Sequence, residues 1–98
     1  MTQIDFIIKL FDYLGYKFID ERVIRNSHNE LWYHNDNLII DVNFKFETGE
    51  ISTIGESMYT MGNKENQFRG IMDSYLKRIP QDKLRDFKIQ LIDDSIQI

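Results

Sequence analysis

The sequence contains no cysteine, which excludes disulfides, thiolate catalysis and every metal site built on cysteine. It has only one proline, so a proline-rich linker is absent. No apolar run exceeds three residues, and no cationic segment precedes an apolar one at the N-terminus. We therefore expect neither a membrane span nor a signal peptide. From these absences we expect a cytoplasmic protein that needs no cofactor and has no membrane partner.

Charge of either sign is moderate, with 16 acidic and 12 basic residues and a formal net charge of −4. The basic residues concentrate between Lys64 and Lys88, where seven of them accompany four acidic ones. With 42% hydrophobic and 13% aromatic residues, the composition is that of an ordinary globular protein. We expect residues 1–98 to form one small acidic domain with a single core.

Strict alternation from Leu38 to Phe46 predicts a strand with one buried face. The residues that follow, 47–50, predict a tight hairpin with Gly49 at a positive φ. The returning strand runs from Ile51 to Met61, and Gly55 within it indicates a bulge or a loop.

Apolar residues dominate the segment from Ile4 to Leu14, which predicts a helix. Thr2 and Asp5 are spaced as a capping box, and Gly15 is suited to the C-terminal cap. The apolar positions cover well over half of the helix circumference. We therefore expect this helix to lie between the sheet and a second neighbour, either another helix or a partner chain.

The other segments complete an α+β fold. We predict a twisted strand or an edge strand at 17–26, a short strand at 30–34, a helix at 68–79 capped by Asn63 and ended by Pro80, and a last strand at 87–91 that Ile96 and Ile98 could extend. The predicted order is α-β-β-β-β-α-β. It makes a two-layer sandwich of two helices on an antiparallel sheet of four to five strands.

We predict no catalytic or metal-ligating residue. His28, Glu30 and His34 would share one face of an extended segment, but turn residues at both ends of that segment argue against convergent ligands. No serine lies in a nucleophile motif, and no glycine-rich loop has phosphate-binding spacing. The chain is therefore not expected to be an enzyme.

The sequence favours a protein that binds another protein, either a different one or a second copy of itself as a homodimer. The first helix is too apolar for one packing face, and residue types enriched in interface cores occur nearby. The predicted partner-binding residues are Trp32, Tyr33, Met58, Tyr59 and Met61. Small acidic domains without catalytic groups are a familiar form of inhibitor or regulator encoded by phages and mobile elements, directed at nucleic-acid-handling or defence proteins. The composition is compatible with that role.

The alternative prediction is a small nucleic-acid-binding or anion-binding module. It would use Lys64, Arg69, Lys77, Arg78 and Lys83 from the basic stretch. The acidic net charge, and the acidic Asp73 among these cations, make nucleic acid the less favoured partner.

Overall fold

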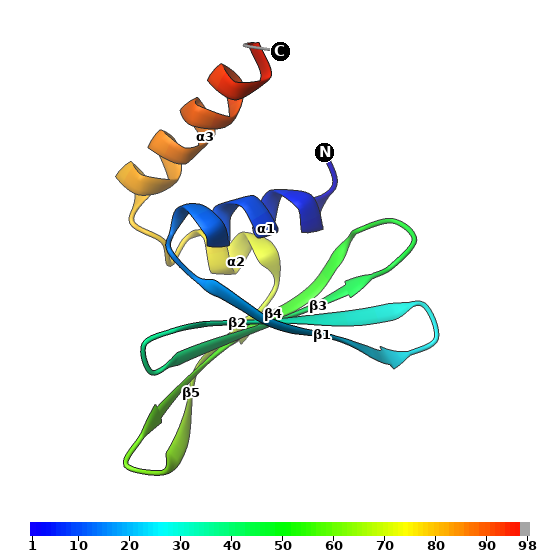
Figure 1. The fold of residues 1–98 in the computed structure, drawn as a ribbon, viewed down its shortest axis with the longest axis vertical. Helices are drawn as coiled ribbons and strands as arrows, with labels where there is room; N and C mark the ends of the chain where they lie inside the picture. Colours follow the sequence, from blue (N-terminus) through cyan, green and yellow to red (C-terminus); the bar gives the residue numbers. More distant parts are fainter. Residues whose placement is uncertain (97–98) are drawn as a thin grey trace.

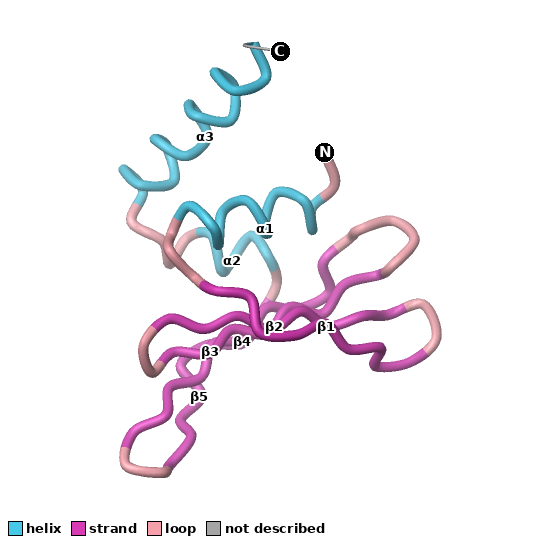
Figure 2. Tube along the Cα trace, viewed as in Figure 1, coloured by secondary structure: helices cyan, strands magenta, loops and turns pink. Residues whose placement is uncertain are grey.

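The computed structural model of this chain describes the backbone of residues 1–96 and the side chains of residues 1–93. The fold is α+β, with helices on one face of a five-stranded antiparallel sheet (Figures 1 and 2). Each strand pairs with its neighbour in sequence, so the sheet order is β1-β2-β3-β4-β5. The elements are α1 (Gln3–Tyr13), β1 (Lys17–Arg25), β2 (His28–Asn35), β3 (Leu38–Lys45), β4 (Ile51–Thr60), β5 (Asn63–Gly70), α2 (Met72–Leu76) and α3 (Gln81–Ile96).

Helix α1 begins at the predicted capping box. Thr2 Oγ1 accepts a hydrogen bond from the Asp5 amide at 3.2 Å, and the Asp5 carboxylate accepts one from the Thr2 amide at 3.3 Å. Because these bonds favour the ionised carboxyl, the pKa of Asp5 lies below its ordinary value. The helix ends before Gly15, whose φ of 86° is the expected left-handed cap.

The hairpin between β3 and β4 is also as predicted, with Gly49 at a φ of 73°. Its carbonyl accepts a hydrogen bond from the Ile4 amide at 2.9 Å, so the hairpin holds the first turn of α1. A Cβ on Gly49 would lie 2.7 Å from the Thr2 Cβ, and this close approach requires glycine.

The core lies between the sheet and the helices, and α1 has two neighbours. Ile7, Leu10 and Phe11 of α1 are fully buried over the sheet. On another side of α1, the rings of Phe6 and Tyr13 pack against Phe87 of α3, with centroids 5.4 and 5.3 Å apart. The expectation that α1 lies between the sheet and a further element is confirmed, and that element is a helix of the same chain. The remaining core residues include Leu31, Tyr33, Ile40, Val42, Phe44, Ile51, Ile54, Tyr75, Ile79 and Leu84.

The predicted helix at 68–79 is wrong in its first part. Residues 63–70 form β5, which pairs antiparallel with β4, and only Met72–Leu76 is helical. The turn between β4 and β5 consists of Met61 and Gly62, both at positive φ, at 52° and 82°. Such a two-residue turn directs the chain back along β4 and forms a hairpin. The helical spacing of apolar residues from Phe68 onward therefore does not decide the structure of residues 63–70, because the turn pairs these residues with β4.

The predicted last strand at 87–91 is also wrong, because these residues lie within α3. Pro80 ends the preceding segment, as expected, but it also begins this helix, and its carbonyl accepts from the Leu84 amide at 3.1 Å. The buried Leu84 and Phe87 and the partly buried Leu91 recur at helical spacing, and Phe87 packs against α1. Ile96 is the last residue of α3, and Ile98 lies outside the described residues. None of the helices described is long and apolar enough to cross a membrane.

Candidate functional site

The first candidate surface is the free edge of the sheet along β1. Every residue of this strand is exposed, and β1 pairs with β2 only. Its apolar side chains stand largely in solvent, with Val23 77% and Phe18 56% exposed, and Phe46 beside the turn from β1 to β2 is 65% exposed. We define the β1 edge as Phe18, Ile19, Val23, Ile24 and Phe46. A strand with unpaired backbone groups and apolar side chains is a template for a further strand.

The pairing of β1 with β2 is interrupted twice. Phe18 pairs with Tyr33 and Asp20 with Trp32, so Ile19 has no partner residue in β2. A second shift leaves Ile24 unpaired in the same way. Bulges of this kind increase the local twist of a strand. They limit the shapes of strand that can pair with the β1 edge.

The opposite edge of the sheet differs in chemistry. In β5, six of the eight residues are exposed, and most of the side chains from Asn63 to Gln67 are polar or charged. Charged side chains along an edge disfavour pairing with another chain. The two edges therefore differ in their exposed apolar side chains: β5 has no exposed large apolar side chain, whereas β1 exposes four of them among five charged residues.

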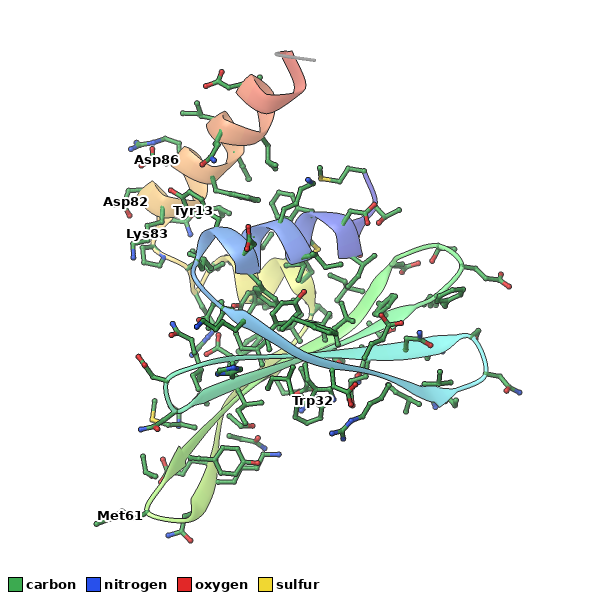
Figure 3. All side chains as sticks on the ribbon, in the orientation of Figure 1. Tyr13, Trp32, Met61, Asp82, Lys83 and Asp86 are labelled. Atoms are coloured by element: carbon green, nitrogen blue, oxygen red, sulfur yellow. The ribbon has the colours of Figure 1, made fainter. Side chains whose placement is uncertain are left out.

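The second candidate surface is the face of the sheet that carries no helix. Trp32 lies on this face, away from the helices (Figure 3). Its indole Nε1 donates to the Glu30 carboxylate at 2.6 Å, and the Arg22 guanidinium lies 5.1 Å from the ring centroid. These contacts hold the partly buried indole in place within the sheet surface.

The same row of the sheet continues to an ion pair. Trp32 pairs with Asp41, Asp41 with Gly55, and Gly55 with Arg69. The Arg69 guanidinium crosses over Gly55 and donates to Asp41 at 3.1 and 3.3 Å. A Cβ on Gly55 would lie 2.6 Å from Arg69 Nη2 and 2.7 Å from Asp41 Oδ1. Gly55 is thus paired on both sides within β4 without a bulge or a loop of its own. The irregularity predicted at Gly55 lies one residue further along, where the pairing with β5 shifts between Glu56 and Ser57.

The structure separates the five predicted partner-binding residues. Tyr33 is only 6% exposed and packs against Phe11, so it lies in the core and not on the surface, where a partner-binding residue is expected. Trp32 lies on the open face, whereas Met58, Tyr59 and Met61 follow one another toward the tip of the β4–β5 hairpin. Met61 is fully exposed at this tip (Figure 3). A single patch of all five residues is not formed, and a binding role for any of them stays a prediction.

The five basic residues of the alternative prediction are also dispersed. Lys64 lies on β5 just after the hairpin tip, Arg69 is paired with Asp41, and Lys77 caps α2. Only Arg78 and Lys83 line a common pocket. Nucleic-acid binding by this set stays a prediction, and no continuous basic surface of these five residues supports it.

The third candidate site is the pocket that Arg78 and Lys83 share, which we call the Glu56 pocket. It has a volume of about 320 Å³ and lies where the end of α1, the end of β2, the middle of β4 and the α2–α3 connection meet. Its lining residues are Leu14, Tyr16, Asn35, Glu56, Tyr75, Arg78, Ile79, Pro80 and Lys83. The Glu56 side chain is 13% exposed, and Arg78 Nη2 lies 3.7 Å from its Oε2. Arg78 also stacks on the Phe68 ring at 4.8 Å.

Burial changes the acid–base properties of this pocket. Desolvation raises the pKa of the Glu56 carboxyl above its ordinary value, and the nearby Arg78 charge opposes the rise without cancelling it. Burial likewise raises the pKa of Tyr75 and of Tyr16, whose hydroxyls share a hydrogen bond, so both phenols are neutral at physiological pH. Sequence reasoning missed Glu56, because one glutamate within a strand carries no signal of its surroundings.

No three His, Cys, Asp or Glu side chains of the described part of the chain are grouped so that they could hold a metal ion. His28, Glu30 and His34 do share the partly buried face of β2, as their alternation in an extended segment requires. Searches for similar proteins found no matching family model, no matching curated protein and no matching solved structure.

Proposed function

We propose that this chain is a non-enzymatic protein-binding domain, and that its partner adds a strand along the β1 edge. The observation that carries the proposal is the contrast between the two edges of the sheet. The β1 edge exposes Phe18, Ile19 and Val23, whereas the opposite edge is polar. Main-chain hydrogen bonds to the free side of β1 would supply affinity, and side-chain contacts on both faces would supply specificity.

The charges of β1 favour a different protein over a second copy. When two identical strands pair antiparallel about a two-fold axis, the residue on the axis faces its own copy. The middle of β1 is Asp20, Glu21 and Arg22, so a centre at any of them opposes like charges. Such pairs destabilise a sheet. A homodimer centred on the middle of this strand is therefore the less favoured arrangement.

The net charge of −4 and the absence of a catalytic motif support a role as an inhibitor or regulator that covers a surface of its target. We place the target among nucleic-acid-handling or defence proteins in the cytoplasm, with this chain encoded by a phage or a mobile element. An acidic body suits a target that normally binds nucleic acid, because such targets carry basic surfaces.

Affinity capture with paired variants tests the proposal. The doubly substituted Ile19→Lys, Val23→Lys chain places two charges on the β1 edge, and the Asn63→Lys, Gln67→Lys chain places the same charges on β5. Because all four positions are exposed, each variant should lose at most about 1 kcal/mol of stability. From an extract of the cell in which the chain acts, we expect one protein to be retained by the wild type and the β5 variant and lost by the β1 variant. Equal retention by the β1 variant would contradict the proposal.

Light scattering over a range of protein concentrations tests the alternative arrangement, a homodimer that forms through the β1 edge. We expect a monomer, because self-pairing centred on the middle of β1 opposes like charges. A dimer that the β1 substitutions abolish would show that a second copy, rather than another protein, occupies this edge.

A further inference from the structure

The Glu56 pocket places a carboxylate inside and two cations at its rim. The Glu56 side chain is 13% exposed, whereas the Arg78 side chain is 44% exposed. Lys83 is exposed in the first turn of α3 (Figure 3). The separation of 3.7 Å between Arg78 and Glu56 is longer than the roughly 2.7–2.9 Å of a charge-assisted hydrogen bond. Both groups therefore keep most of their capacity to bind a ligand.

Among the described residues, Glu56 forms one ion pair, the long contact with Arg78. The raised pKa of its carboxyl shows that burial leaves the carboxylate less well solvated than in water. A ligand that brings a cationic donor to Glu56 would relieve this deficit. Once Glu56 is engaged in this way, Arg78 and Lys83 can neutralise an anionic group at the rim.

We propose that the Glu56 pocket binds a small zwitterion of the free amino acid class. The ammonium group of the ligand lies against Glu56, and its carboxylate lies against Arg78 and Lys83. The side chain of the ligand packs on the apolar wall formed by Leu14, Ile79 and Pro80. This inference does not depend on the proposed role of the β1 edge.

The size and the fixed groups of the pocket fit this class. A volume of about 320 Å³ corresponds to the space of roughly ten water molecules, which is enough for a free amino acid. Glu56, Arg78 and Lys83 carry a combined formal charge of +1, so a neutral zwitterion or a singly charged anion is favoured over a cation. The buried Tyr75 fixes the floor through its hydrogen bond with Tyr16.

Calorimetric titration of the full chain with glycine, alanine, leucine and phenylalanine tests the proposal. We expect at least one of the four to bind saturably below about 10 mM, and the same amino acid to raise the unfolding temperature by mass action. Glu56→Gln keeps the shape of the side chain and removes its charge, and Arg78→Gln removes one of the two rim cations. Each should weaken binding about tenfold or more, whereas Lys77→Gln, next to Arg78 but outside the pocket, should leave it unchanged.

The N-acetylated form of the best-binding amino acid lacks the ammonium group and provides the matched ligand control. We expect its affinity for the wild type to fall at least as far as Glu56→Gln lowers that of the free amino acid. Failure of all four amino acids to bind would overturn the proposal. So would equal binding of the acetylated form, or binding that Glu56→Gln leaves unaffected.

Discussion

At the scale of single residues, the open face of the sheet depends on Gly55. Arg69 reaches Asp41 only because Gly55, the residue between them in the sheet, has no side chain. The Asp41 side chain is 6% exposed, and Arg69 is its only hydrogen-bond partner among the bonds described. A buried carboxylate without its donor is costly, so this pair should be sensitive to changes at three positions.

We predict that Gly55→Ala and Arg69→Ala each lower the free energy of unfolding by about 2 kcal/mol, because each removes the donor from Asp41. Both changes remove the same contact, so the double variant should cost clearly less than the sum of the two. Urea unfolding of the four chains measures this coupling. Arg22→Ala on the same face is the control and should cost at most about 1 kcal/mol, since its pair with Asp20 is exposed. Strict additivity would show that the pair does not act as described.

The buried Glu56 makes the stability of the folded chain depend on pH, and the direction of its raised pKa sets the sign of that dependence. Because burial raises its pKa in the folded state, the folded chain binds this proton more tightly than the unfolded chain. The resulting stabilisation is complete below the unfolded pKa and is lost as pH rises through the folded pKa. Glutamine resembles the uncharged acid and does not titrate. Between about pH 4 and about pH 7 we therefore expect wild-type stability to fall relative to Glu56→Gln.

Urea unfolding of both chains at the two pH values measures this difference. The opposite result would be a free energy of unfolding that rises with pH in the wild type relative to Glu56→Gln. It would mean that the attraction of Arg78 outweighs the cost of burying the carboxylate.

At the scale of elements, the sequence specifies those parts whose signals are local. The alternation from Leu38 to Phe46 and the glycine at 49 give the central hairpin, and Thr2 with Asp5 gives the start of α1. The fold class is likewise confirmed, and the strand after α1, expected to be twisted or at an edge, is an edge strand. In each case, short-range backbone geometry and side-chain pattern agree.

The sequence did not predict α3 or β5, because the apolar pattern of each segment fits another structure or is missing. Phe87, Ile89 and Leu91 alternate as in a strand, but with Leu84 they also fit a helix, and Pro80 starts that helix. Strand β5 has almost no apolar pattern at 63–67, since it is held by pairing with β4 after the Met61–Gly62 turn. Periodicity reports burial on one face, and a polar edge strand has no such face.

The candidate sites show the same limit. Arg78 and Lys83 were identified as basic residues, but their meeting with Glu56 and Tyr16 requires the end of α1, β4 and the α2–α3 connection to come together. Such convergence depends on long-range packing. Trp32 was identified by residue type alone, and only the sheet register shows that Arg22 and Glu30 hold it.

At the scale of the whole molecule, the helices cover one face of the sheet and leave its other face and its β1 edge open (Figure 1). The surplus of apolar residues on α1 is largely accounted for by α3, although Ile8 is still 38% exposed. Among the strands, the most exposed large apolar side chains are instead Val23 and Phe18 of β1. We therefore propose the β1 edge, rather than α1, as the place where another protein binds.

Hydrogen exchange of the chain, free and bound to the protein captured through the β1 edge, tests this claim most directly. The outward-facing amides of β1 have no strand to pair with in the free chain, so they should exchange quickly and slow by about tenfold or more in the complex. The amides of β5 should be unchanged. Protection confined to the open face or to α3, with β1 exchanging as in the free chain, would contradict the account.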